Sequence, residues 1–382
     1  MFWVSRAAIA AVAVFAALTV GEGGLPERNA QKFDAPALTH PFGGFGDTLL
    51  SPLARWDSVW YLSIADSGYD GPAREAFFPL YPLLVRALAA PAGAPPEALL
   101  LASYAISLAA LLGALYLLWR LVSLELGRPY AYPTLLLLAA FPGSLFFGAP
   151  YSESLFLLAS VGAFYTARTG HWAWAGALAA SASATRSAGI LLLLPLGILW
   201  WQSERRSLRD APWLALGPVG LATYAVYLEA AIGDGLAFLQ VQEAWFRHFA
   251  GPLGGAWDGT VAAFEGARGL LDGDEPLPRW AAMNLMLFGF MVFALTACVG
   301  VLRRLPFAYG AYVVAALMLP LSFPVEPQPL MSLPRFLAVL FPVFMWLAIV
   351  CEERRITDGV AALSALVLGL FVTQFATWHF IA

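Results

Sequence analysis

A carboxylate set among aromatic side chains is the first feature of this sequence that could perform chemistry. Asp57 lies in the stretch RWDSVWYLSIADSGYD, residues 55–70. If residues 56–66 are helical, Asp57 falls at the flank of the apolar face that Trp56 and Trp60 share. A partly desolvated carboxylate is a stronger base, which suits general-base chemistry. An acid is also favourable in the first turn of a helix, so a purely structural role explains Asp57 too.

A second acid and two arginines could act together with it. Glu153 follows Pro150 and Ser152 in FPGSLFFGAPYSESLFLLA, where capping of the next helix by Ser152 explains the motif as well as a functional acid does. Arg186, in SASATRSAGILLLLP, and Arg335, in LMSLPRFLAVLFPVF, lie near the ends of apolar segments. A cation there needs an anionic partner, or it extends to the lipid headgroups. Two arginines without an equally placed lysine favour phosphate recognition.

A second aromatic and charged stretch, FLQVQEAWFRHFAGPLGGAWDG, covers residues 238–259. Its Trp245, Arg247 and His248 could contact a sugar, whereas a tryptophan at this kind of site is equally typical of a membrane anchor. The 4 histidines of the chain are scattered without metal-ligand spacing. The sequence contains no Gly-rich phosphate loop, no G-x-S-x-G motif and no H-E-x-x-H motif.

The elements that must position these residues are membrane helices. The 382 residues are 60% hydrophobic and 12% charged, whereas soluble domains carry about 25% charged residues. Continuous apolar runs of about 15–25 residues predict helices that cross a bilayer. We expect residues 1–20 to be an uncleaved first helix rather than a signal peptide. The predicted spans are 2–20, 98–119, 131–148, 153–167, 172–187, 188–201, 211–231, 281–302, 305–322, 335–350 and 357–378.

The distribution of arginines predicts how these spans are oriented. Arginines occur in alternate short connections, at 120 and 128, 168, 205, 206 and 209, 303 and 304, and 354 and 355. Positive-inside bias makes these connections cytoplasmic. Residues 172–201 must then cross twice as a tight helical hairpin, with Arg186 near the outer surface. We predict one membrane domain over residues 1–382, with a cytoplasmic N-terminus and with two long outer loops at 21–97 and 232–280.

In their order along the chain, these segments resemble those of the PIG-V-type mannosyltransferases. The stretches that carry the resemblance are RWDSVWYLSIADSGYD with FFPLYPLL, then FPGSLFFGAPYSESLF, ATRSAGILL, FLQVQEAW and SLPRFLAVLFP, over about residues 50–345. The ordered set is fairly specific, and any single motif is weak. This family adds the second mannose in glycosylphosphatidylinositol anchor synthesis and has bacterial relatives.

The resemblance implies an all-α polytopic protein of the GT-C type, with about eleven transmembrane helices and with amphipathic helices in the first outer loop. It implies inverting transfer of a sugar, with mannose expected, from a polyprenyl-phosphate donor at the outer face. Asp57 matches the family's base, Glu153 matches the acid of its PYSE segment, and Arg186 and Arg335 match basic positions that could hold the donor phosphate. Further substrate contacts are expected from Arg55, Trp56, Trp60, Tyr61, Tyr151, Trp245, Arg247 and His248.

The expected cofactors and partners follow from this chemistry. Cations can stabilise a leaving phosphate without a metal, although a divalent metal held by Asp57 and Glu153 is compatible with the sequence. A composition rich in Ala, Leu and Arg, with Lys32 as the single lysine, indicates a bacterial plasma membrane. The acceptor is then a glycolipid, a polymer or a protein, and the sugar could be another hexose or a pentose. The net charge of -4 gives no indication of a nucleic-acid partner.

Two other classes of function remain open at this point. A transporter or flippase of lipid-linked saccharides could use the same acids and arginines to guide headgroups. Such a protein should show repeat symmetry and polar residues midway along its spans, and this chain shows neither clearly. A non-catalytic subunit of a glycosyltransferase is the third alternative.

Overall fold

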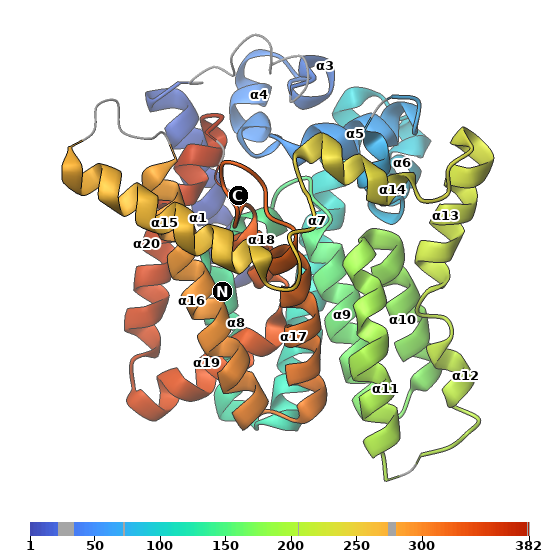
Figure 1. Cartoon of the computed structure of the whole chain (residues 1–382). Helices are drawn as coiled ribbons and strands as arrows, with labels where there is room; N and C mark the ends of the chain where they lie inside the picture. Colours follow the sequence, from blue (N-terminus) through green and yellow to red (C-terminus); the bar gives the residue numbers. More distant parts are fainter. Residues whose placement is uncertain (22–33, 72, 205, 274–279, 380, 382) are drawn as a thin grey trace.

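The computed structural model describes residues 1–21, 34–71, 73–204, 206–273, 280–379 and 381. In this part of the chain every regular element is a helix (Figure 1). One isolated antiparallel bridge joins Arg247 to Val325. The prediction of an all-α architecture is therefore confirmed.

The predicted spans correspond to helical elements whose bounds are α1 (Phe2–Thr19), α7 (Pro96–Glu125), α8 (Arg128–Ala140), α9 (Glu153–Arg168), α10 (Trp172–Thr185), α11 (Leu193–Gln202), α12 (Ala211–Leu214), α13 (Val219–Ile232), α16 (Ala281–Arg304), α17 (Phe307–Ser322), α18 (Leu333–Ala338), α19 (Phe341–Arg354) and α20 (Thr357–Ala376). Among them, α1, α7, α16 and α20 are long and apolar enough to cross a membrane by length and composition. These helices bear out a polytopic membrane protein.

Three predicted spans are broken rather than continuous. Residues 131–148 comprise α8 and the 3₁₀ helix η4 (Pro142–Phe147), residues 211–231 comprise α12 and α13, and residues 335–350 comprise α18 and α19. A proline lies at each break, at positions 142, 218 and 342. Proline disfavours helical backbone in the residue before it and lacks the N–H that would continue the helix. Hydropathy alone therefore overestimated the continuity of these three segments.

The connections predicted to be cytoplasmic gather at one end of the helix bundle, the lower end in Figure 1. At that end Arg168 forms an ion pair with Glu125, which also accepts a hydrogen bond of 2.9 Å from Tyr309. Arg304 and Glu353 form a second ion pair at 2.7 Å. Helices of the first long loop, which the sequence predicts to be an outer loop, cover the opposite end. The arginine pattern thus correctly predicted that these connections lie at the same end of the bundle.

The predicted hairpin within residues 172–201 is present as a reversal of the chain at Arg186. The 3₁₀ helix η5 (Ser187–Leu192) turns back against the end of α10 before α11 begins. Gly189 lies so close to α10 that a Cβ atom there would overlap the backbone of Ala182 and Ser183. A residue without a side chain is required at this contact, which holds Arg186 at the tip of the turn.

The first outer loop folds into short helices above the bundle: α3 (Pro36–Thr39), α4 (Gly44–Leu50), η1 (Ser51–Leu53), α5 (Asp57–Ser67), η2 (Arg74–Ala76), α6 (Leu80–Ala89) and η3 (Ala90–Ala92). Helix α6 packs on α7, where the fully buried Tyr81 donates a hydrogen bond of 3.0 Å to the Ser103 carbonyl. Helix α5 packs on both α6 and α7. The first residue of α5, Asp57, is thereby fixed against the bundle.

The second outer loop contains α14 (Ala237–Gln240), η6 (Val241–Trp245) and α15 (Gly254–Asp272). Helix α15 lies across the bundle in Figure 1 and packs on α16 and α17. Its buried face carries Gly259 and Gly266, while Trp257 and Phe264 on the other face are exposed. Small residues on one face and aromatic residues on the other suit a helix lying at a membrane interface.

Segment η4 packs against elements from distant parts of the sequence, including α9, α18 and α20. A Cβ atom on Gly143 would overlap the Pro334 carbonyl oxygen, so η4 and α18 are in direct backbone contact. The buried Arg6 of α1 donates hydrogen bonds to the carbonyl oxygens of Ser144 at 2.6 Å and Ala139 at 3.3 Å. Together with the Ser144 hydroxyl, which donates to the Ala139 carbonyl at 2.7 Å, these bonds satisfy carbonyl groups at the break between α8 and η4. Segment η4 therefore holds α18, and with it Arg335, beside the start of α9.

Candidate active site

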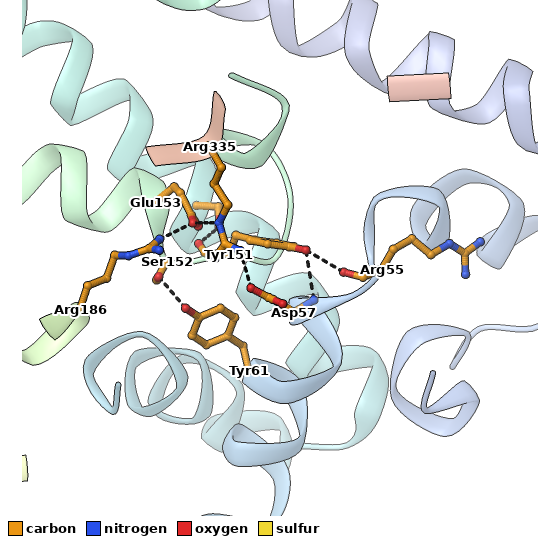
Figure 2. Close-up of polar contacts among 9 residues, drawn as sticks. Arg55, Asp57, Tyr61, Tyr151, Ser152, Glu153, Arg186 and Arg335 are labelled. Carbon is orange, nitrogen blue, oxygen red and sulfur yellow. Dashed lines mark hydrogen bonds and ion pairs between the residues drawn. The ribbon is translucent and has the colours of Figure 1, made fainter. Parts of the chain in front are cut away.

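Two carboxylates and two guanidinium groups that are far apart in the sequence form one cluster, which Figure 2 shows. Arg335 donates from Nη1 to Asp57 Oδ2 and from Nε to Glu153 Oε1. Arg186 donates from Nη1 to the same Glu153 oxygen. All four residues that the sequence analysis selected as catalytic or phosphate-binding are thus in contact through three ion pairs.

Each member of the cluster comes from the end of a helical element. Asp57 and Glu153 are the first residues of α5 and α9, Arg186 is the extended residue that ends α10, and Arg335 lies in the single-turn helix α18. Helix N-termini carry a partial positive charge that favours the two carboxylates. Ends and breaks of helices at one end of the bundle therefore create the place where these charges meet.

The prediction that Ser152 caps α9 with its side chain is wrong. Ser152 precedes the helix but forms no capping hydrogen bond; its hydroxyl lies 2.7 Å from the hydroxyl of Tyr61. The tyrosine ring is buried against Tyr81 and Phe77. Burial, followed by the negative charge of Glu153, raises the pKa of Tyr61 to about 12. Ser152 therefore connects α9 to α5 rather than capping its own helix.

Tyr151 fixes the backbone on which Asp57 sits. Its hydroxyl accepts a hydrogen bond from the Asp57 N–H and donates one to the Arg55 carbonyl, both at 3.1 Å (Figure 2). Between these two residues, the backbone of Trp56 has a φ of 56°, a conformation that residues other than glycine rarely adopt. Burial, followed by the charge of Asp57, raises the pKa of Tyr151 well above its usual value, so the hydroxyl remains a donor.

The two carboxylates differ sharply in their access to a substrate. The Asp57 side chain is 25% exposed, whereas that of Glu153 is 0% exposed and lies between two arginines. Glu153 Oε2 has no hydrogen-bond partner within the described residues. Asp57 is therefore the more accessible of the two acids, and the Glu153 carboxylate is closed off from solvent.

The cavity beside Asp57 is nearly closed. It has a volume of about 10 Å³, roughly the space of a single water, and a sugar requires far more. Its lining residues are Trp56, Asp57, Phe146, Tyr151, Arg335, Phe375 and Ile381. Phe375 and Ile381 belong to the end of α20 and the segment after it. The sequence analysis missed this contribution, because the aromatic composition of TQFATWHFIA does not by itself indicate where the segment lies.

Three residues predicted to contact substrate, Arg55, Trp56 and Trp60, pack against aromatic side chains. The Arg55 side chain points away from the cluster in Figure 2, is 1% exposed and lies 4.5 Å over the ring of Trp378. Trp56 also packs edge-to-face on Trp378, with 5.6 Å between ring centroids. Trp60 stacks on Phe77 at 5.6 Å. Among these side chains, Trp56 lines the cavity beside Asp57.

The second outer loop contributes one predicted residue to the cluster. The Arg247 guanidinium lies 5.7 Å from the ring of Phe336, the residue next to Arg335. His248 is exposed. The side chain of Trp245, which was predicted to contact substrate, lies outside the described part of the structure. Arg247 is therefore a predicted contact whose side chain approaches the charged residues.

The cluster does not present a set of metal ligands. Within the described residues, no three His, Cys, Asp or Glu side chains gather in a way that could hold a metal ion. Asp57 and Glu153, the two ligands suggested by the sequence, are bound to arginines instead. The guanidinium groups bind one oxygen of each acid, Asp57 Oδ2 and Glu153 Oε1, so arginines are the cations that contact these carboxylates.

Comparison with known proteins supports the resemblance inferred from the motifs. The family model for "Mannosyltransferase (PIG-V)" matches residues 24–204, a range that includes Asp57, Glu153 and Arg186. The chain is 31% identical over 178 residues to GPI alpha-1,6-mannosyltransferase 2 of Rattus norvegicus, which covers 44% of this chain and 36% of the relative. It is 36% identical over 140 residues to GPI mannosyltransferase 2 of Chaetomium globosum, covering 32% and 29%.

The chain thus spans about a third of the length of the curated relatives that it matches. No solved structure matches it. The matched range ends before Arg247 and Arg335, so these two residues are supported by the sequence motifs and by their place in the fold and not by the family model.

Proposed function

We propose that this chain, whose residues 24–204 match the PIG-V mannosyltransferase family, is a membrane glycosyltransferase. It moves mannose from a polyprenyl-phosphate donor to a hydroxyl group of an acceptor. The observation that carries the proposal is the contact of a partly exposed carboxylate, Asp57, with the guanidinium group of Arg335. A base and a phosphate-binding cation side by side are what transfer from a phosphate-linked sugar requires.

The reaction proceeds in one displacement with inversion. Asp57 accepts the proton of the acceptor hydroxyl as its oxygen attacks the anomeric carbon of mannose. The bond between that carbon and the phosphate oxygen breaks, and its electron pair remains on the phosphate. Arg186 and Arg335 stabilise the negative charge that develops there. Since the donor is held in the membrane by its lipid, the protein needs no nucleotide-binding domain.

Glu153 serves this chemistry as a positioning residue. Its buried carboxylate binds Arg186 and Arg335 at the same oxygen and so holds the two guanidinium groups together before the donor arrives. Two unpaired cations would repel each other and would be costly at this depth. The direct catalytic role predicted for Glu153 from the sequence remains a prediction, and its complete burial favours the positioning role.

The chemistry takes place on the extracytoplasmic side of a bacterial plasma membrane. This assignment is supported by the arginine-bearing connections, which gather at the end of the bundle opposite the cluster (Figure 1). The whole of residues 1–382 then forms one membrane domain of the GT-C type, with both long loops outside. The acceptor is a glycolipid, a polymer or a protein reached from that side.

The proposal is tested by reconstituting the purified full chain in lipid nanodiscs. Radiolabelled mannose on a synthetic polyprenyl phosphate is offered with bacterial glycolipid, polymer and peptide acceptors. We expect label to enter one acceptor class and to remain absent when GDP-mannose replaces the lipid donor. If no acceptor is labelled while the protein moves the lipid donor across vesicle membranes, the protein is a transporter and the proposal is wrong.

Replacing Tyr151 by Phe is expected to lower both stability and transfer. The substitution leaves the Asp57 N–H without the hydroxyl that it binds, and it removes one of the two hydrogen bonds to the Arg55 carbonyl, which keeps the Ser58 N–H. A buried polar group that loses its partner costs about 1–3 kcal/mol. The backbone that carries the base then moves. Thermal unfolding and the initial rate of mannose transfer measure the two effects.

The matched control is Tyr224→Phe, which removes a hydrogen bond of 3.0 Å to the Glu75 carbonyl away from the cluster. This change should lower stability without a comparable loss of transfer per folded molecule. Equal losses of transfer in the two variants would contradict the positioning role of Tyr151.

A further inference from the structure

A third guanidinium group approaches the cluster from the second outer loop. The backbone of Arg247 forms a bridge with Val325, which anchors the loop near α18. Its guanidinium carbon lies 5.7 Å from the ring centre of Phe336, and that of Arg186 lies 5.8 Å from the same ring. Phe336 directly follows Arg335. The ring of Phe336 therefore lies near the guanidinium groups of both Arg186 and Arg247, next to the residue that binds the two carboxylates.

Arg247 is the member of this group that has no carboxylate of its own. Within the described residues it forms no ion pair, and its guanidinium contacts the Phe323 carbonyl oxygen at 3.5 Å, a distance at which a hydrogen bond is weak. Arg186 and Arg335 are both engaged with Asp57 and Glu153. Three guanidinium groups facing two carboxylates leave one positive charge uncompensated.

The Arg247 side chain is partly buried, so this uncompensated charge lies where water screens it incompletely. Burial, followed by repulsion from Arg335, lowers the pKa of Arg247 to about 10. The group therefore remains positively charged at neutral pH. A partly desolvated cation that has no carboxylate partner and lies next to the proposed base favours the binding of an anion.

We propose that Arg247 is the residue that binds the phosphate of the donor and makes the site selective for a donor with a single negative charge. This inference rests on the proposed function and assigns the first phosphate contact to Arg247 rather than to the arginines already paired with acids. A sugar on a polyprenyl phosphate is a phosphodiester with one negative charge, which matches the one uncompensated charge. The negative charge of a diphosphate-linked donor would exceed this single positive charge.

The charge remains balanced through the reaction. When the acceptor oxygen bonds to the anomeric carbon, the acceptor proton moves to Asp57, which becomes neutral and releases Arg335. The carbon–oxygen bond to the phosphate breaks at the same time, and its electron pair gives the lipid phosphate a second negative charge. Arg335 then turns from Asp57 to the phosphate. The product dianion thus faces two uncompensated cations, Arg247 and Arg335.

The experiment measures binding of lipids to the full chain in nanodiscs, without turnover. The probes are decaprenyl phosphomannose, decaprenyl phosphate, decaprenyl diphosphate and uncharged decaprenol. We expect Arg247→Gln to weaken binding of phosphomannose about 10- to 100-fold, the effect of losing one charged hydrogen bond, and to leave binding of decaprenol unchanged. Arg247→Lys should recover part of the affinity because it retains the charge.

The matched control is Arg268→Gln on the same loop, since Arg268 is exposed and pairs with Asp272; its affinities should equal those of the wild type. In transfer assays Arg247→Gln should raise KM for the donor more than it lowers kcat. Undiminished phosphomannose binding by Arg247→Gln, with transfer intact in the wild type, overturns this inference alone. A wild type that binds decaprenol and phosphomannose equally and transfers nothing overturns the proposed function as well.

Discussion

Asp57→Asn is expected to reduce mannose transfer by about 100- to 10,000-fold, the range that a positioned general base contributes. The amide has nearly the shape of the carboxylate but cannot take the acceptor proton. Asp57 is 25% exposed, so its replacement should change stability much less than it changes the rate. The measurement is the initial rate of transfer by the purified protein at saturating donor, with thermal unfolding recorded on the same samples.

The control for this variant is Asp66→Asn, because Asp66 is an exposed acid near the other end of α5. Its rate should equal that of the wild type. Binding of the lipid donor should survive in Asp57→Asn, because removing the carboxylate frees Arg335 for the phosphate. A rate within a few-fold of the wild type would rule out Asp57 as the base and would leave the cluster with a structural role.

Glu153→Gln is expected to produce the largest loss of stability, about 3–5 kcal/mol, as is typical when one partner of a buried ion pair is removed. The carboxylate is fully buried and holds both Arg186 and Arg335. With a neutral amide in its place, the two guanidinium groups repel each other next to Asp57. A large fall in the unfolding temperature, together with weakened donor binding, is the expected result.

Glu125→Gln provides the comparison for this variant at the opposite end of the bundle. Glu125 is also buried, but its partner Arg168 is 40% exposed and can regain water when the pair is lost. The loss of stability should therefore be clearly smaller. If Glu153→Gln instead keeps its stability and its donor binding but loses transfer, then Glu153 acts directly in catalysis, as the sequence motif first suggested.

Much of the fold follows from local features of the sequence. Continuous apolar runs indicate the helices, since a lipid environment requires every backbone group to be paired within the segment. The arginines of the short connections indicate which ends lie together, and the contacts of Glu125 with Arg168 and Tyr309 agree with that assignment. Three of the predicted segments are interrupted near the prolines at 142, 218 and 342. An average of hydropathy over many residues does not detect such breaks.

The candidate site was predictable only in part. The types and order of Asp57, Glu153, Arg186 and Arg335 identified them as a group, because charged residues close to a membrane need partners. The different roles of Asp57 and Glu153 could not be predicted from the sequence, because they depend on how completely each carboxylate is buried. Ser152 illustrates the limit: its position before a helix suggested a cap, whereas the neighbouring Tyr61 engages its hydroxyl.

The sequence by itself therefore determined that this is a helical membrane protein with its acids and arginines at the ends of apolar segments, because hydrophobic length and charge asymmetry are local properties. The tertiary structure decided which acid is accessible, which arginines are already paired, and that Arg247 carries the uncompensated charge. These properties depend on distances between residues as far apart as Asp57 and Arg335, and burial and Coulomb interactions follow distance in space rather than along the chain.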